Sequence, residues 1–379
     1  MGSEPIKVLF VDDSAVVRRV VSEHLAKDPA LEMVGAAANG KIALSRLSLL
    51  RPDVVVLDVE MPEMDGLQTL AEIRKSHPWL PVIMFSTVTE HGAAATLDAL
   101  ALGANDYVAK PGAANGTSGQ IGPVCRELVE KIKAHCKERA CDSSTRDPST
   151  RGRGLAAQAG RKSAEISLAP VVRPASQRSE IVVVGVSTGG PNALAEMVPQ
   201  LPADLPAPVL IAQHMPPTFT RLLAERLAAK SRVPVVEACA DEPLRPGKVW
   251  IAPGDYHLTV QESGGTVTIQ TNREARENFC RPSADVLFRS AAAVFGPRAL
   301  AVVMTGMGQD GLLGTTAIRE RGGQVIVQDE QSSVVWGMPG YVARAGLADK
   351  TVPLAELAQE ILRRVRRPMP SLSLAGARL

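Results

Sequence analysis

Short apolar runs alternate with amphipathic segments along most of the chain. In the first 139 residues, five apolar runs are typical of buried strands, at 7–11, 32–37, 54–58, 82–86 and 106–110. The segments between them carry apolar residues three and four positions apart, and a last candidate helix lies around 124–137. Alternating strands and helices predict an α/β domain with a doubly wound, five-stranded parallel sheet.

A second α/β pattern occupies residues 180–367. Its apolar runs predict strands in "IVVVGVS", "PVLIAQH", "GKVWIAP", "ALAVVMTG" and "GQVIVQD", and its helix-like segments are 191–200, 218–230, 284–295 and 311–321. The stretch "HLTVQESGGTVTIQT" alternates around Gly264 and Gly265, which predicts an antiparallel hairpin. We therefore expect a three-layer α/β domain with a mostly parallel sheet and one antiparallel hairpin.

Residues 140–179 separate the two patterns. They are rich in Ser, Arg, Gly, Pro and Ala and show no sustained period, which predicts a flexible linker. The expected organisation is a first domain at 1–139, a linker at 140–179, a second domain at 180–367 and a tail at 368–379.

Composition narrows the class of protein. A net charge of +2 and an aromatic content of 3% argue against a nucleic-acid binder. The five cysteines form no CxxC pair, so a reducing compartment is expected rather than a disulfide or zinc framework. No apolar run approaches the roughly 20 residues that span a bilayer, and the first residues do not form a signal-peptide pattern. We expect a cytoplasmic protein without membrane insertion.

Polar side chains follow four strands of the first domain. Asp12 and Asp13 come after the first strand, Asp58 ends the third, Ser86 the fourth and Lys110 the fifth. Because ligands bind at the carboxyl ends of parallel strands, these groups are expected at one edge of the sheet. Clustered carboxylates favour Mg²⁺, and a carboxylate such as Asp58 could accept a phosphoryl group. For Asp13 or Ser14 alone, helix capping is the simpler interpretation.

The stretches "VDD", "LDVEMPEMDG" and "YVAKPG" resemble the receiver domain of two-component response regulators, over about residues 5–138. The resemblance implies a flavodoxin-like fold and phosphorylation of Asp58 by a partner histidine kinase. It implies that Mg²⁺ is held by Asp12, Asp13 and Asp58. It also implies a switch through Ser86, Tyr107 and Lys110.

The stretch "IVVVGVSTGG" places Ser187 between Gly185 and Gly189, directly after a strand. This spacing fits a nucleophile elbow, in which a strand turns sharply into a helix. The same glycines could instead form a phosphate nest or a plain tight turn. The chain lacks a Walker lysine here and completes no GxGxxG, which weakens the nucleotide interpretation.

Two further residues could complete a hydrolase site. His214 ends the strand in "PVLIAQHMPP", and Asp310 lies in the loop "TGMGQDG" after another strand. A buried capping histidine and a helix N-cap are the structural alternatives. The order Ser, His, Asp differs from the Ser, Asp, His order of α/β-hydrolases. The other histidines are expected to be solvated or structural, namely His24, His77, His91, His135 and His257.

The sequence from 180 to 365 resembles the catalytic domain of the chemotaxis protein-glutamate methylesterase (CheB) family. The matching stretches are "GVSTGGP", "QHMPPTFT", "IAPGDYHL", "RPSADVLFRSAA", "MTGMGQDG" and "QDEQSSVVWGMP". This resemblance implies Ser187 as nucleophile, His214 as general base and Asp310 as its orienting group. It implies the Met307 backbone N–H as oxyanion donor, supported by Thr188, and no cofactor for the esterase reaction. One departure is Cys280, where the family usually has His before "RPS"; it puts substrate contacts in doubt.

The resemblance implies a hydrolase that removes methyl groups from glutamate γ-methyl esters of chemoreceptors and deamidates receptor glutamines. Phosphorylation at Asp58 is expected to activate it by weakening the packing of the receiver over the active site. Two alternatives are a regulator whose second domain only binds a partner, and a general hydrolase of small esters.

Overall fold

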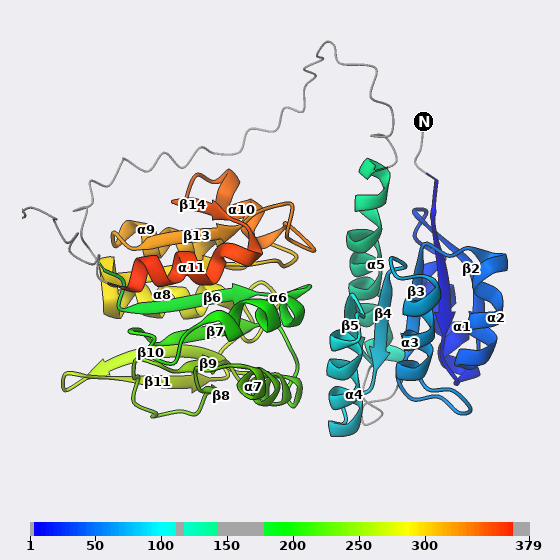
Figure 1. Ribbon diagram of the computed structural model, residues 1–379, viewed down its shortest axis with the longest axis horizontal. Coiled ribbons are helices and arrows are strands. Elements are labelled where there is room, and N and C mark those ends of the chain that lie inside the picture. The colour runs from blue at the N-terminus through cyan, green and yellow to red at the C-terminus, as the bar shows by residue number, and fades with distance from the viewer. Residues whose placement is uncertain (1–3, 111–116, 143–177, 367–379) are drawn as a thin grey trace, which may run out of the picture.

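The computed structural model describes residues 4–110, 117–142 and 178–366. Two α/β domains lie side by side (Figure 1). Most of the expected linker, residues 143–177, and the expected tail at 368–379 lie outside the described residues. Within the described residues, no helix combines the length and the apolar character needed to cross a bilayer.

The N-terminal domain contains a five-stranded sheet in the order β2-β1-β3-β4-β5, and every pairing is parallel. Its strands are β1 (Ile6–Val11), β2 (Leu31–Ala37), β3 (Val54–Asp58), β4 (Val82–Ser86) and β5 (Asp106–Ala109). The central strands β3 and β4 are buried along their whole length, which explains their continuous apolar sequence. The predicted doubly wound sheet is confirmed.

Five helices cover this sheet: α1 (Ala15–Leu25), α2 (Gly40–Leu50), α3 (Gly66–Ser76), α4 (Glu90–Ala101) and α5 (Thr117–Asp142). Four of them begin with a side chain that accepts a backbone N–H, from Ser14, Asn39, Asp65 and Thr89. Helix α5 begins earlier than the apolar pattern predicts and contains Pro123 within its first turns. Pro123 lies beyond the first turn, so it removes one intrahelical hydrogen bond to the carbonyl four residues earlier.

The C-terminal domain is built on a seven-stranded sheet in the order β14-β13-β12-β6-β7-β9-β8, again parallel at every pairing. Its strands are β6 (Ile181–Val186), β7 (Val209–Gln213), β8 (Val235–Glu237), β9 (Val249–Ile251), β12 (Ala299–Val303), β13 (Gln324–Gln328) and β14 (Lys350–Val352). The predicted hairpin, β10 (His257–Ser263) and β11 (Thr266–Asn272), forms a separate two-stranded sheet. It turns at Gly264 and Gly265, whose φ values are 58° and 79°.

Helices pack on both faces of the large sheet: α6 (Gly190–Met197), α7 (Phe219–Lys230), α8 (Ala284–Phe295), α9 (Leu312–Glu320), α10 (Met338–Arg344) and α11 (Leu354–Val365), with short 3₁₀ helices at Val198–Gln200 and Gly296–Arg298. The first four agree with the helix-like segments of the sequence. Helix α11 was not predicted, although Leu357, Ile361 and Val365 are buried at helical spacing.

The two domains meet where α4 of the first packs against α6 and α7 of the second (Figure 1). The Tyr107 ring of β5 stacks on the Phe219 ring at the start of α7, with centroids 4.9 Å apart. Two ion pairs cross the same boundary, Arg221 to Glu90 at 2.7 Å and Arg226 to Asp98. Apolar packing and charge pairs therefore join the domains beside the loops that follow β6 and β7.

Candidate active site

Ser187 lies in the sharp turn between β6 and α6. Its backbone N–H donates to the Thr305 carbonyl at 3.0 Å, which ties the turn to the loop after β12. Gly189 has φ of 74°, a value that favours glycine. A Cβ on Gly306 would come 2.8 Å from the Ser187 Cβ, so the two loops touch at a point where only glycine fits. The structure therefore places Ser187 in the strand–turn–helix context that a nucleophile elbow requires.

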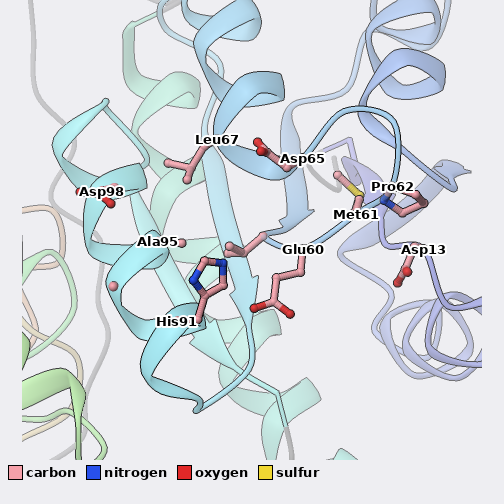
Figure 2. Close-up of a pocket in the computed structure, with 11 residues that line it drawn as sticks. Asp13, Glu60, Met61, Pro62, Asp65, Leu67, His91, Ala95 and Asp98 are labelled. Atoms are coloured by element: carbon pink, nitrogen blue, oxygen red, sulfur yellow. The ribbon is translucent and has the colours of Figure 1, made fainter.

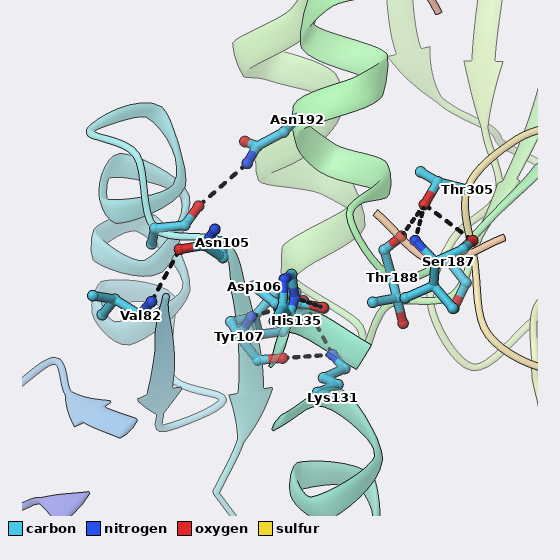
Figure 3. A network of polar contacts seen from close by, with 12 residues as sticks. Val82, Asn105, Asp106, Tyr107, Lys131, His135, Ser187, Thr188, Asn192 and Thr305 are labelled. Carbon is cyan, nitrogen blue, oxygen red and sulfur yellow. Dashed lines mark hydrogen bonds and ion pairs between the residues drawn. The ribbon is translucent and has the colours of Figure 1, made fainter. Parts of the chain in front are cut away.

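A threonine bridge holds the two loops together (Figure 3). The Thr305 hydroxyl donates to the Thr188 carbonyl at 2.9 Å and accepts from the Val335 backbone N–H at 3.0 Å. Ser187, Thr188 and Met307 line the same cavity, whose volume is about 710 Å³. The two residues named for oxyanion support thus lie beside the proposed nucleophile.

His214 follows β7 and borders this cavity. Its backbone N–H donates to the Val186 carbonyl at 3.2 Å, so the histidine is held one strand away from the elbow. Its Nε2 lies 2.7 Å from the Asp310 Oδ2. The structure brings together an imidazole and a carboxylate that are far apart in the chain.

Asp310 is 2% exposed and accepts an unusual number of hydrogen bonds. Besides His214, its donors are the Ser283 hydroxyl, the Asn278 side-chain amide and the backbone N–H groups of Ala284, Asp285 and Gly311. Burial opposes ionisation, but His214 and these donors hold the pKa of Asp310 well below its usual range. Asp310 is not the N-cap of the following helix, because Gly311 holds that position; its carboxylate accepts instead from the Gly311 N–H and from the first residues of α8.

The environment of His214 favours its protonated form. Burial acts to lower its pKa, but Cys280 and Asp310 outweigh that effect and raise the pKa to about 10. Cys280 Sγ lies 3.4 Å from His214 Nδ1, on the opposite side of the ring from Asp310. Both ring nitrogens therefore have a partner.

The Ser187 hydroxyl and the His214 ring line one cavity, but no hydrogen bond joins them among the residues the structure describes. The nitrogen that faces away from Asp310 contacts the thiol instead. Hydrogen bonds of catalytic groups are often long before substrate binds, so this geometry is compatible with a serine nucleophile.

Three residues of this site were not predicted from the sequence. Asn278 and Ser283 bond Asp310, and Asp285 bonds both Asn278 and the Gly314 backbone N–H. Burial and the neighbouring Asp310 raise the pKa of Asp285 to about 6. The stretch "RPSAD" carried a weak signal, since Ser and Asp before an apolar run are typical of a helix start.

A second cluster lies at the carboxyl edge of the N-terminal sheet. Oxygens of Asp12, Asp13 and Asp58 lie within 4.8 Å of one another. Lys110 Nζ is 2.8 Å from Asp12 Oδ2 and 2.7 Å from Asp58 Oδ2. Burial raises the pKa of Asp58 to about 6, against the opposing effect of Lys110. Three carboxylates with one lysine leave excess negative charge, and hard oxygen donors of this kind suit Mg²⁺.

The surroundings of this cluster fit a phosphoryl acceptor. Ser14 caps α1, which leaves the exposed Asp13 side chain at the cluster. Ser86 is buried, and its hydroxyl donates to the Gly92 carbonyl at 3.0 Å. A groove of about 630 Å³ beside Asp13 runs between the loop after β3 and helix α4, with Glu60 and His91 on its walls (Figure 2).

Tyr107 connects this domain to the candidate active site. Burial raises its pKa well above the usual value, and its ring stacks on Phe219. Lys131 Nζ contacts the Tyr107 carbonyl at 2.6 Å and Asp106 Oδ1 at 3.2 Å (Figure 3).

The expectation of a solvated His135 is wrong. Its side chain is 5% exposed and its Nε2 lies 3.5 Å from Asp106 Oδ2, because α5 packs on β5.

Comparisons with known proteins identify a family for each domain. Residues 182–361 match the CheB methylesterase family, and residues 8–117 match the response regulator receiver domain. A protein-glutamate methylesterase/protein-glutamine glutaminase of Trichodesmium erythraeum is 47% identical over 95% of this chain and 99% of that protein. A protein of the same name from a Nocardioides strain is 48% identical over 98% of this chain and 99% of its own length.

Among solved structures, the catalytic domain of Thermotoga maritima CheB methylesterase is 40% identical, with a TM-score of 0.48, and covers 49% of this chain and 98% of that one. The full-length relatives cover both domains in the order found here. The chain belongs to the CheB methylesterase family, with an N-terminal response regulator receiver domain.

Proposed function

We propose that this protein hydrolyses glutamate γ-methyl esters of chemoreceptors, releasing methanol, and that the same site deamidates receptor glutamines. Family membership and the names of the relatives support the reaction class. The observation that carries the proposal is the 2.7 Å contact between His214 Nε2 and Asp310 Oδ2, in a cavity that also contains Ser187.

The contact to Asp310 assigns a role to each ring nitrogen. With Nε2–H donating to Asp310, the lone pair of the ring is on Nδ1, which is then the basic atom. Asp310 keeps the ring in this tautomer and stabilises the imidazolium that forms when a proton is taken up. Proton transfer requires the Ser187 hydroxyl to reach Nδ1, which Cys280 Sγ contacts in this structure.

The reaction then follows the serine hydrolase pattern. The Ser187 oxygen adds to the ester carbonyl while His214 takes its proton, and His214 returns that proton to the leaving methanol. Water then attacks the acyl-enzyme with His214 again as base. The Met307 backbone N–H would stabilise the oxyanion, a contribution of about 10² to 10³ in rate for one donor, and Thr188 supports the loop. No cofactor is needed for these steps.

We further propose that Asp58 accepts a phosphoryl group from a partner histidine kinase. Asp12, Asp13 and Asp58 would hold Mg²⁺, which when bound neutralises charge on the phosphoryl oxygens. Lys110 already contacts two of these carboxylates and would move to the phosphoryl group. Ser86 lies at the end of the neighbouring strand, where its hydroxyl could exchange the Gly92 carbonyl for a phosphoryl oxygen.

The proposed regulation is that the receiver restricts access to the active site. Tyr107, Glu130 and Lys131 of the receiver line the cavity that contains Ser187 and His214. The Asn192 side-chain amide of α6 donates to the Ala104 carbonyl at 3.3 Å, next to the Tyr107 strand (Figure 3). Phosphorylation of Asp58 would weaken these contacts through Ser86 and Tyr107.

The gating is expected to be partial. Shifting the ratio of open to closed molecules from 1:99 to 99:1 takes about 5.5 kcal/mol of differential stabilisation, and a single phosphoryl site need not supply so much. Deleting residues 1–140 is expected to raise the basal esterase rate. An unchanged or lower rate in the shortened chain would contradict gating by the receiver.

The experiment that tests the function compares two substrates with two chains. Methylated receptor membranes and a small soluble glutamate γ-methyl ester are each given to the wild type and to Ser187→Ala, and methanol is measured. We expect release from membranes by the wild type alone and much slower hydrolysis of the small ester. Faster hydrolysis of the soluble ester would favour a general small-ester hydrolase, and no hydrolysis of either would favour a binding module.

A further inference from the structure

Cys280 lies against the catalytic imidazole, on the side opposite to Asp310. Its Sγ is 3.4 Å from His214 Nδ1, while His214 Nε2 is 2.7 Å from Asp310 Oδ2. A thiol, an imidazole and a carboxylate thus stand in series. A thiol next to a base that is itself oriented by a third group is the arrangement of an activated cysteine nucleophile.

The turn that carries Cys280 is strained and is anchored to the same carboxylate. Phe279 has a φ of 63°, where a bulky residue is an outlier, whereas Asn278 at 51° is a residue type that adopts this region more readily. The Cys280 N–H donates to the Glu277 carbonyl at 2.8 Å, and the Asn278 side chain donates to Asp310 Oδ1 at 3.1 Å. Such strain persists where the surroundings hold it in place, and here Asp310 positions both the histidine and the thiol.

Cys280 is also accessible, in contrast to two other cysteines. It is half-buried and lines the cavity of about 710 Å³ that contains Ser187. Cys125 and Cys136 are buried in the N-terminal domain, and Cys239 is exposed. Within the described residues, no hydrogen bond joins Cys239 to an imidazole. Cys239 therefore serves as the control thiol, because it is exposed but has no neighbouring base.

We propose that Cys280 is a second nucleophile of this cavity, served by His214 as base, and that it reacts with low-molecular-weight disulfides. With the thiol proton held on His214, Sγ attacks one sulfur of the disulfide. The S–S bond of the small molecule breaks, a mixed disulfide forms on Cys280, and the other half leaves as a thiolate that receives the proton from His214. The small disulfide is the oxidant, and a dithiol reverses the step.

The adduct would stop the hydrolase. It occupies the space next to His214 Nδ1, which is the nitrogen that Ser187 needs for its own proton transfer. This consequence rests on the proposed function, whereas formation of the adduct does not. Cys280 is therefore a reversible modification site inside the active-site cavity.

The first test measures where and how fast the adduct forms. The full chain is incubated with glutathione disulfide, and each cysteine peptide is followed by mass spectrometry in the wild type, His214→Gln and Ser187→Ala. We expect Cys280 to react roughly tenfold or more faster than Cys239 in the wild type and in Ser187→Ala, with the advantage lost in His214→Gln. Cys125 should stay unmodified in every chain, which reports an intact fold.

Two results would overturn the proposal. One is a Cys280 rate no greater than that of Cys239 in the wild type. The other is an equal Cys280 rate in wild type and His214→Gln while Cys125 stays protected. If His214→Gln exposes Cys125, the conservative variant Asp310→Asn replaces it, because it too removes the oriented base, and an unchanged Cys280 rate there would have the same meaning.

The second test reads out the hydrolase. Esterase activity of the wild type should fall in proportion to the Cys280 adduct and return on addition of dithiothreitol. Activity of Cys280→Ser, whatever its starting level, should not respond to glutathione disulfide. A fully modified wild type that keeps its activity would refute the switch. A wild type without esterase activity would instead refute the proposed function, and the adduct rates would still decide whether Cys280 is a nucleophile.

Discussion

The Tyr107 ring of the receiver domain stacks on the Phe219 ring of the catalytic domain, with centroids 4.9 Å apart and an angle of 11° between the planes. Phe219 begins helix α7, only a few residues after His214. Tyr107 lies on β5, whose neighbouring strand β4 ends in Ser86. One aromatic contact thus joins the edge of the proposed phosphorylation site to the segment that carries the proposed base.

Replacing Tyr107 tests whether this contact restricts the enzyme. An aromatic pair contributes about 0.5–1.5 kcal/mol beyond the area it buries, so Tyr107→Ala, which also removes buried area, is expected to raise the basal esterase rate severalfold or more. The measurement is the initial rate without phosphodonor, beside Leu49→Ala, which removes an exposed apolar side chain of α2. A Tyr107→Ala chain with normal folding and the wild-type basal rate would count against the contact as a restraint.

The ion pair between Arg226 and Asp98 offers an independent test of the same interface. Both side chains are partly exposed, so the pair should contribute about 0.2–1 kcal/mol. Arg226→Asp is expected to raise the basal rate by about fivefold or less, because like charges then face each other. Adding Asp98→Arg should return the rate toward the wild-type value. Failure of the double variant to do so would indicate that the pair does not hold the domains together.

The environment of His214 predicts a pH effect. The base must be unprotonated to act, so the rate should rise with pH as His214 loses its proton. Among the described residues, Cys280 and Asp310 are the titratable groups bonded to the ring, and both raise its pKa, which lies at about 10. Removing the sulfur in Cys280→Ala lowers that pKa and should move the acidic limb of the kcat/KM profile to lower pH.

The control for this shift is Cys239→Ala, which removes an exposed thiol and should leave the profile unchanged. Cys280→His, the residue usual in the family, should also move the limb to lower pH, because a neutral imidazole replaces the sulfur. An acidic limb at the wild-type position or at higher pH in Cys280→Ala would show that the thiol does not control protonation of His214.

Removing the charge of Asp310 should affect the chemical step. Asp310→Asn keeps the size of the side chain but no longer selects the tautomer with a basic Nδ1. A loss of about 10⁴-fold in kcat, with KM little changed, is the expected result for a serine hydrolase. Circular dichroism is needed beside the kinetics, because Asp310 also accepts hydrogen bonds at the start of α8. A folded variant with a loss below about tenfold would exclude this role.

Most helices and strands, and the positions of most candidate site residues at strand ends, could be predicted because they depend on local sequence patterns. Strands such as β3 and β6 are buried on both faces and are therefore continuous apolar runs. Asp58, Ser187 and His214 directly follow or end such strands, and the carboxyl ends of parallel strands share one edge. Their approximate neighbourhood follows from connectivity alone.

The remaining features depend on tertiary packing. The Asn278 bond to Asp310 and the Cys280 contact to His214 come from an irregular turn without a period to interpret. The Tyr107–Phe219 stack depends on how the two domains dock, and the sequence of neither domain carries a local pattern that predicts this docking. The burial of His135 follows from the packing of α5 on β5, which a polar helical segment does not reveal.

The most direct measurement of the central claim is the initial rate of methanol release from methylated receptor membranes, with and without a small phosphodonor. Three full-length chains are compared: the wild type, Ser187→Ala and Asp58→Asn. We expect release by the wild type that increases with phosphodonor, no release by Ser187→Ala, and release by Asp58→Asn that does not change with phosphodonor. Release by Ser187→Ala at the wild-type rate would contradict the central claim.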